Sequence, residues 1–191
     1  MEFFQKMRGA GQCPPRVRRS EIVSSFLGSL AGMALLGLLH YNVADPADRV
    51  LLVGSFAASA VLLFAAPKSP LAQPRNLLGG HVLSAIIGVT VRLALPDMPW
   101  LAGALATATA IAAMHMTRTL HPPGAATAFI AVTGGPKIIA LGDLYVLCPA
   151  LARRSLLPAK ASALAGPLLL LCVALATNAL TPGRRYPEYW W

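Results

Sequence analysis

The chain alternates long apolar runs with short polar breaks, and this pattern is its dominant feature. A helix needs roughly 20 apolar residues to cross a hydrocarbon core about 30 Å thick. Most runs approach that length, whereas the run over 124–135 is too short for a full crossing and predicts a half-length helix. We therefore predict an all-α, polytopic helical membrane bundle with about five to six apolar segments, including proline-broken or half-length helices. The runs cover residues 21–40, 50–66, 77–96, 100–116, 124–135, 138–152 and 161–180.

The composition also indicates a membrane environment. Of the 191 residues, 56% are hydrophobic and 12% are charged, and the mean hydropathy is +0.62, far from the balance of soluble domains. We divide the chain into a basic N-terminal tail (1–19), a transmembrane domain (20–181) and a basic, aromatic C-terminal tail (182–191). A basic segment before an apolar run also describes a signal peptide, but no clear small-residue cleavage pattern follows, so a retained first span is predicted. The lipid bilayer is the first expected partner.

The basic residues lie mainly at the ends of the apolar runs. The formal net charge is +9, but a nucleic-acid surface needs clustered Lys and Arg, and only Arg16, Arg18 and Arg19 cluster. Nucleic acid is therefore not an expected partner. Because cytoplasmic loops are enriched in Lys and Arg, the N-terminus and both proline-containing loops are placed on the cytoplasmic side. We predict an integral protein of the bacterial inner (plasma) membrane.

Two proline-rich breaks interrupt the apolar runs beside basic residues. One covers residues 67–76, and the other contains Pro122 and Pro123. Irregular backbone at membrane depth is tolerated where protein buries it or where it lines a watery cavity. Each break leads into a helix start with small residues, where exposed amides attract anions. The two hairpins look alike, and internal duplication and coincidence both remain open as explanations.

Two motifs in these breaks carry a resemblance to a known family. The stretches SPLAQPRNLLGGHVLSA (69–85) and HPPGAATA (121–128) resemble motifs of the HPP family of membrane proteins, and the final RRYPEYWW resembles the ending of that family. The likeness covers most of the chain after Glu21. It implies a helical domain that crosses the membrane several times, and a transport role that plastid and cyanobacterial members perform on nitrite. The chain departs from the family over 153–160, where a basic, proline-containing segment interrupts the expected last helix.

The resemblance also supplies the candidate site. We expect Gln73, Asn76 and Thr127 to donate hydrogen bonds to a small oxyanion near the two helix N-termini, with basic residues drawing the anion in. A structural role stays open for both Arg75 and His121. Arg75 could simply belong to the basic residues of a cytoplasmic loop, and His121 could cap the helix or stabilise the helix break. The candidate substrate-binding residues are Gln73, Arg75, Asn76, Gly79, Gly80, His81, His121, Gly124 and Thr127, and the prolines that shape the backbone are Pro70, Pro74, Pro122 and Pro123.

These features predict a membrane transporter or channel for a small inorganic anion, with nitrite as the first candidate. The sequence shows no nucleophile and base at a suitable spacing, no zinc motif and no nucleotide loop, so neither an enzyme nor a cofactor or metal site is predicted. The alternative is a non-transporting membrane subunit or sensor that acts through a partner protein. Small-residue faces such as Gly28-x-x-x-Gly32 predict close helix packing and permit a homo-oligomer.

Charges inside the apolar runs need a partner or an interface, because they are expensive in lipid. Arg92 either reaches the outer interface or pairs with Asp143, and both alternatives stay open. Arg153 and Arg154 are expected to reach an interface or to face protein.

Overall fold

A computed structural model describes residues 7, 11, 13, 15–41, 54–134 and 164–191. Within these ranges the regular structure is helical, which confirms the predicted helical bundle. The predicted apolar run over 138–152, and with it Asp143, Arg153 and Arg154, lies outside the described residues. The helices are α2 (Arg19–Tyr41), the apolar helix Gly54–Ala65 with its π-helical end η1 (Val61–Ala65), the 3₁₀ turn η2 (Pro70–Ala72), α4 (Pro74–Ala94), α5 (Pro99–Thr117), α6 (Pro122–Thr133) and α8 (Ala165–Leu180).

Helix length separates full spans from shorter pieces. Among the described residues, three helices are long and apolar enough to cross a bilayer: α2 over Arg19–Leu38, α4 and α5. The helices Gly54–Ala65 and α8 are shorter but apolar. Helix α6 has 12 residues, which agrees with the predicted half-length helix.

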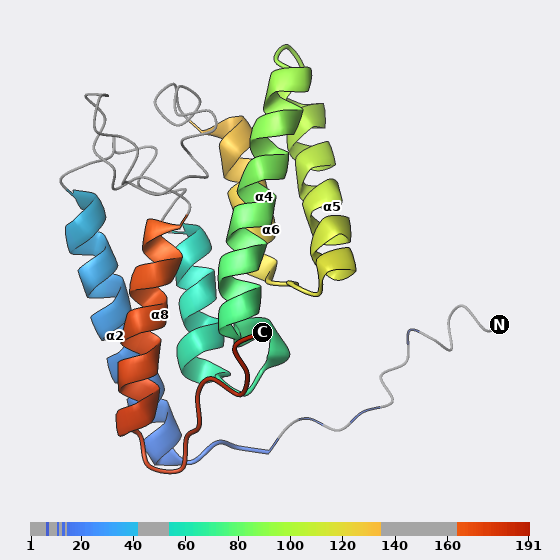
Figure 1. Cartoon of the computed structure of the whole chain (residues 1–191). Helices are drawn as coiled ribbons and strands as arrows, with labels where there is room; N and C mark the ends of the chain where they lie inside the picture. Colours follow the sequence, from blue (N-terminus) through green and yellow to red (C-terminus); the bar gives the residue numbers. More distant parts are fainter. Residues whose placement is uncertain (1–6, 8–10, 12, 14, 42–53, 135–163) are drawn as a thin grey trace.

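The helices form two groups that share α4 as a neighbour (Figure 1). In the first group, α2, α8 and Gly54–Ala65 pack around an apolar core that contains Leu36, Phe64 and Leu170 and reaches α4 at Leu77, all of them fully buried. In the second group, α5 and α6 pack on α4 through buried alanines. The alanines of this second core are Ala102, Ala106 and Ala110 on α5 and Ala128 on α6.

Close packing in the first group rests on the two predicted interface glycines. A Cβ added to Gly28 would lie 2.6 Å from Cδ1 of Phe64, and one added to Gly32 would lie 3.1 Å from side-chain atoms of Phe64 and Leu170. The aromatic ring therefore occupies the space that larger residues on α2 would fill. This confirms the predicted packing face of Gly28-x-x-x-Gly32.

Both proline breaks lie at the same end of the bundle (Figure 1). The start of α2 and the C-terminal tail lie at this end too, which we call the proline end. The grouping agrees with the predicted alternation of loops. That the proline end is cytoplasmic stays a prediction.

The helices that follow the breaks begin with proline. Pro74 and Pro122 occupy the first turns of α4 and α6, where the missing N–H is no loss and the fixed φ suits a helix. Helix α4 therefore starts three residues before the apolar run that predicted it, and the irregular segment is shorter than expected.

The C-terminal tail folds back over the first break. The hydroxyl of Tyr186 donates to the carbonyl oxygen of Ala72 at 2.9 Å, and the amide of Glu188 donates to Oε1 of Gln73 at 2.8 Å. The aromatic residues beyond them, Trp190 and Trp191, are exposed, as expected for side chains at headgroup level.

Candidate functional site

Five buried polar side chains meet in the interior of the bundle, and we call them the His–hydroxyl cluster. Each is at most 3% exposed. They come from Gly54–Ala65, α4 and the start of α6, so three segments of the chain build the cluster. Its members are Ser55, Ser59, His81, His121 and Thr127.

Glycines bring the two histidines together where α4 crosses the start of α6. A Cβ added to Gly124 would lie 2.9 Å from the backbone of Gly80, and one added to Gly80 would lie 2.7 Å from Cβ of His121. The backbones thus approach at a distance that only glycine permits. The rings of His81 and His121 consequently lie 5.2 Å apart between centroids.

Hydrogen bonds link the cluster into one chain. Oγ1 of Thr127 lies 2.7 Å from Nδ1 of His81, and Nε2 of the same ring lies 3.2 Å from Oγ of Ser59. Oγ of Ser59 lies 2.9 Å from Nε2 of His121, whose Nδ1 lies 2.8 Å from the carbonyl oxygen of Leu71. Oγ of Ser55 lies 3.2 Å from Oγ1 of Thr127 and 2.8 Å from the carbonyl oxygen of Pro123, and its one proton can be donated to only one of these two acceptors at a time.

The carbonyl of Leu71 fixes the order of the protons, because it can only accept. Nδ1 of His121 must donate to it, so Nε2 of the neutral ring accepts the proton of Ser59. Oγ of Ser59 then accepts from Nε2–H of His81, and Nδ1 of His81 accepts from Thr127. Every donor in the sequence Thr127, His81, Ser59, His121 points toward Leu71.

Such an ordered chain can relay a proton. A proton delivered at Thr127 passes by short hops through His81 and Ser59 and makes an imidazolium of His121, after which the bonds among the four side chains point the other way. In the described residues, the hydrogen-bond and ring partners of the two histidines, besides each other, include Ser59, Thr127, the phenyl ring of Phe56 and the carbonyl of Leu71. A charge on His121 therefore has no carboxylate among these neighbours to neutralise it.

The described part of the chain contains no group of three or more His, Cys, Asp or Glu side chains that could hold a metal ion. Two imidazoles with hydroxyl partners suit proton transfer and the binding of an anion better than metal coordination.

The structure brings the two predicted halves of the site together at the proline end. Arg75 donates to the carbonyl oxygen of Thr117, and Nδ2 of Asn76 donates to that of Leu120, both at 2.9 Å. His81 contacts Thr127 five residues further along α4. The two proline breaks and the helix starts that follow them therefore lie side by side.

Several predicted ligands of the anion already have protein partners. Gln73 donates to the carbonyl oxygens of Pro67 and Ser69 and accepts from Glu188, so its amide ties the break to the tail. Arg75 is hydrogen-bonded in an exposed position. Asn76 keeps one atom without a hydrogen-bond partner in the described structure, the buried Oδ1.

The predicted glycines and prolines shape the backbone of the site. Gly79 packs against the side chain of Thr119, and Gly80 and Gly124 form the helix crossing. Pro123 supplies the carbonyl oxygen that Ser55 bonds. Pro70, Pro74 and Pro122 begin their helical segments.

Arg92 lies away from this site, near the far end of α4. It donates to the carbonyl oxygen of Pro96 at 2.8 Å in an exposed position. This agrees with an arginine that reaches the interface.

Two members of the cluster were not predicted from the sequence. Ser55 and Ser59 lie in an apolar run and belong to neither motif. Their spacing of four residues puts both on one helix face, and this periodicity is the signal that identifies them.

Comparison with known proteins places the chain in a family. The sequence model of the HPP transmembrane region matches residues 14–187, which is nearly the whole chain. The chain belongs to the HPP transmembrane family. The His–hydroxyl cluster thus lies within the HPP region, and His121, Pro122 and Pro123 form the sequence His-Pro-Pro.

Two curated relatives are transmembrane proteins of Dictyostelium discoideum. Each is 41% identical to this HPP chain, and the alignments of 194 and 196 residues cover the whole length of this chain. The chain spans only 58% and 64% of their lengths, less than two thirds of each. No solved structure matches the chain.

Family and fold together make the chain an integral membrane protein. The bacterial inner membrane stays a prediction, and the two relatives come from a eukaryote.

Proposed function

We propose that this HPP protein transports a small inorganic anion, with nitrite as the first candidate, and that the anion passes the His–hydroxyl cluster. The observation that carries the proposal is the cluster itself: two histidines and three hydroxyl residues, fully or almost fully buried in an apolar bundle. Polar and ionisable side chains inside a membrane are costly, and they commonly mark ion pathways or proton relays. Nitrite comes from the resemblance to family members with that substrate.

The relay gives the transport step a physical basis. In the neutral state the rings of His81 and His121 form all four of their hydrogen bonds with protein groups. Protonation of His121 puts a positive charge among hydroxyl groups that can turn toward an anion. A proton and the anion then enter the buried site together, which avoids a lone charge in the low-dielectric interior.

The proline end provides the entrance for the anion. Arg75 is partly exposed beside the starts of α4 and α6, and basic side chains and helix N-termini raise the local concentration of anions. The unpartnered Oδ1 of Asn76 lies between this surface and the cluster along α4. It can accept a hydrogen bond from water or from nitrous acid, the protonated form of nitrite.

The alternative is a non-transporting subunit or sensor. The closed packing around the cluster favours it, since His81 and His121 are both 0% exposed. In that case protonation of the cluster would change the packing of α4 against α6 and be read by a partner protein.

Nitrite uptake into proteoliposomes separates the two proposals. We would compare the wild type, His121→Gln and the matched control His115→Gln, each with and without an inward proton gradient. His115 lies in the last turn of α5 and is exposed. We expect wild-type uptake that the gradient accelerates, a loss of at least roughly tenfold in His121→Gln because hydrogen bonds to charged groups are lost, and near wild-type uptake in the control.

Folded wild type without flux under either condition would contradict transport of nitrite. Chloride and nitrate as competitors would then test other small anions in the same vesicles. Absence of flux for all of them would leave the sensor or subunit as the function to pursue.

A further inference from the structure

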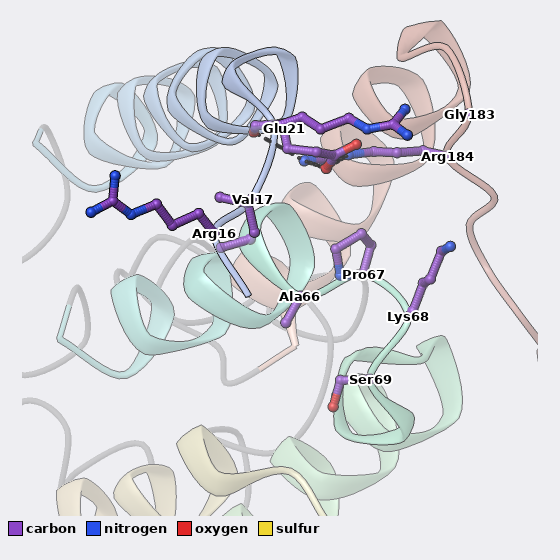
Figure 2. A pocket seen from close by; sticks show the side chains of 11 residues that line it. Arg16, Val17, Glu21, Ala66, Pro67, Lys68, Ser69, Gly183 and Arg184 are labelled. Carbon is purple, nitrogen blue, oxygen red and sulfur yellow. Dashed lines mark hydrogen bonds and ion pairs between the residues drawn. The ribbon is translucent and has the colours of Figure 1, made fainter. Parts of the chain in front are cut away.

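A second polar feature lies outside the His–hydroxyl cluster, in a pocket of about 520 Å³ at the proline end (Figure 2). The start of α2, the segment after η1 and the C-terminal tail form its walls. Four basic side chains and one carboxylate line it: Arg16, Arg18, Lys68, Arg184 and Glu21.

Arg184 and Glu21 form the rigid wall of this pocket. Nη2 of Arg184 lies 2.7 Å from Oε2 of Glu21, and the arginine side chain is only 4% exposed. Its other donors bond the carbonyl oxygen of Phe64, Oδ1 of Asn178 and Oγ of Ser25. The guanidinium is therefore fully used inside the protein, and its charge is balanced by Glu21.

The other basic side chains have no such partner among the described residues. Arg16, Arg18 and Lys68 are exposed, and Figure 2 shows Lys68 on the same side as Arg184, while Arg16 extends to the opposite side. Glu21 is the one carboxylate in the lining and already pairs with Arg184, so the lining does not neutralise the charges of the other three basic side chains. An anion in the pocket would meet basic side chains from two chain segments far apart in the sequence.

The position of the pocket in the bundle indicates headgroup level. It lies where α2 begins and just beyond the end of α8 at Leu180, so it marks the boundary of the apolar helices. Directly beside it, α2 exposes an apolar face that includes Ile22, Val23 and Phe26, each more than half exposed. A basic pocket next to an exposed apolar helix face matches an amphipathic ligand with an anionic head and acyl chains.

We propose that this pocket binds the phosphate of an anionic phospholipid headgroup, with the acyl chains lying along the exposed face of α2. The lipid would join α2 to the break at Lys68 and to the tail, and so hold the proline end together. This role is independent of which ion, if any, the His–hydroxyl cluster carries.

Native mass spectrometry of the purified protein in an uncharged detergent tests the proposal. Phosphatidylglycerol is titrated in parallel with phosphatidylcholine of the same acyl chains, and inorganic phosphate and glycerol 3-phosphate serve as soluble competitors. The variants are Arg18→Gln, Lys68→Gln and both together. Arg92→Gln is the matched control, because it removes one partly exposed basic charge at the far end of α4.

We expect phosphatidylglycerol to bind more tightly than phosphatidylcholine. Each pocket variant should weaken its binding about fivefold and the pair at least roughly tenfold, since one basic residue near anionic lipid contributes on the order of 1 kcal/mol. The control and the two soluble phosphates should change the binding little.

Equal binding of the two lipids, or equal weakening by Arg92→Gln, would overturn the proposal. Displacement of phosphatidylglycerol by millimolar inorganic phosphate would overturn it too and assign the pocket to a free phosphate. Thermal unfolding of each variant in the same detergent establishes that a loss of binding is not a loss of fold.

Discussion

At the scale of residues, hydroxyl groups determine the state of the two buried histidines. Ser59 stands between Nε2 of His81 and Nε2 of His121, and its hydroxyl contacts both rings. With the carbonyl of Leu71 at one end, it sets which nitrogen carries each proton. The chemistry of the site therefore depends on a residue without charge.

Ser59→Ala should destabilise the protein by about 1–3 kcal/mol, because it leaves a buried acceptor on His121 and a buried donor on His81 without partners. Thermal unfolding in detergent measures the loss. Thr90→Ala is the control, since it removes an exposed hydroxyl that bonds its own helix. Equal losses in the two variants would contradict the ordered chain.

Tyr186 makes the stability of the tail depend on pH. Burial raises the pKa of its phenol, so the folded protein favours the neutral form. The resulting stabilisation is present below the ordinary pKa of tyrosine, about 10, and is lost as the pH rises above it. Unfolding temperatures between pH 9 and about 11 should fall less steeply for Tyr186→Phe than for the wild type. Tyr189→Phe, at an exposed position, should keep the wild-type slope.

The sequence predicted part of the site at this scale. His81, His121 and Thr127 lie in recognisable motifs, and the structure brings them together. Ser55 and Ser59 lie in a plain apolar run, and a serine in such a helix often bonds only its own backbone. Their role depends on which face of Gly54–Ala65 meets α4, and this is a property of packing.

At the scale of elements, close helix crossings position the site. Gly80 and Gly124 let α4 and α6 touch near the histidines, and Gly88 continues the contact deeper in the bundle. The alanines of α5 pack on the same pair. Because these surfaces fit without spare space, small changes in volume should alter stability.

Gly88→Ala should destabilise the protein by about 1–3 kcal/mol through overpacking. The added Cβ would lie 2.6 Å from the carbonyl oxygen of Ala128 and 2.7 Å from Cβ of Ala131. Gly37→Ala is the matched control, since nothing lies within 4 Å of its added Cβ, and the better helix propensity of alanine should leave stability unchanged or raised. Thermal unfolding that ranks the two variants in the opposite order would contradict this packing.

The element boundaries show what sequence patterns can and cannot provide. Helices α2 and α5 follow their apolar runs within a few residues, because long hydrophobic stretches have one stable solution in a membrane. The start of α4 was missed by three residues, since proline signals both a break and a first turn. The fold-back of the tail was missed because its contacts with Ala72 and Gln73 join residues more than 110 positions apart.

At the scale of the whole molecule, Arg184 connects the tail to the helices of the first group. It joins Glu21 and Ser25 of α2, the carbonyl of Phe64 in η1 and Asn178 of α8. This role could not be predicted from the sequence, because Arg184 and Arg185 look equivalent in a basic tail.

Arg184→Gln should therefore destabilise the protein by about 3 kcal/mol, because it leaves a partly buried carboxylate and several buried acceptors unpaired. Arg185→Gln removes the same charge from an exposed position and should change stability by less than about 0.5 kcal/mol. Thermal unfolding of both variants in one detergent, at low and high salt, provides the comparison. A similar, salt-sensitive loss in both would indicate a general charge effect instead.

The central claim is that an anion crosses the membrane through the His–hydroxyl cluster, and nitrite uptake by Thr127→Val in proteoliposomes tests it most directly. The substitution keeps the shape and removes the one hydroxyl that bonds Nδ1 of His81. Thr107→Val makes the same change on α5, where the hydroxyl bonds only its own helix. We predict at least roughly tenfold slower uptake in Thr127→Val and near wild-type uptake in Thr107→Val. Equal uptake by the two folded variants would contradict a pathway through the cluster.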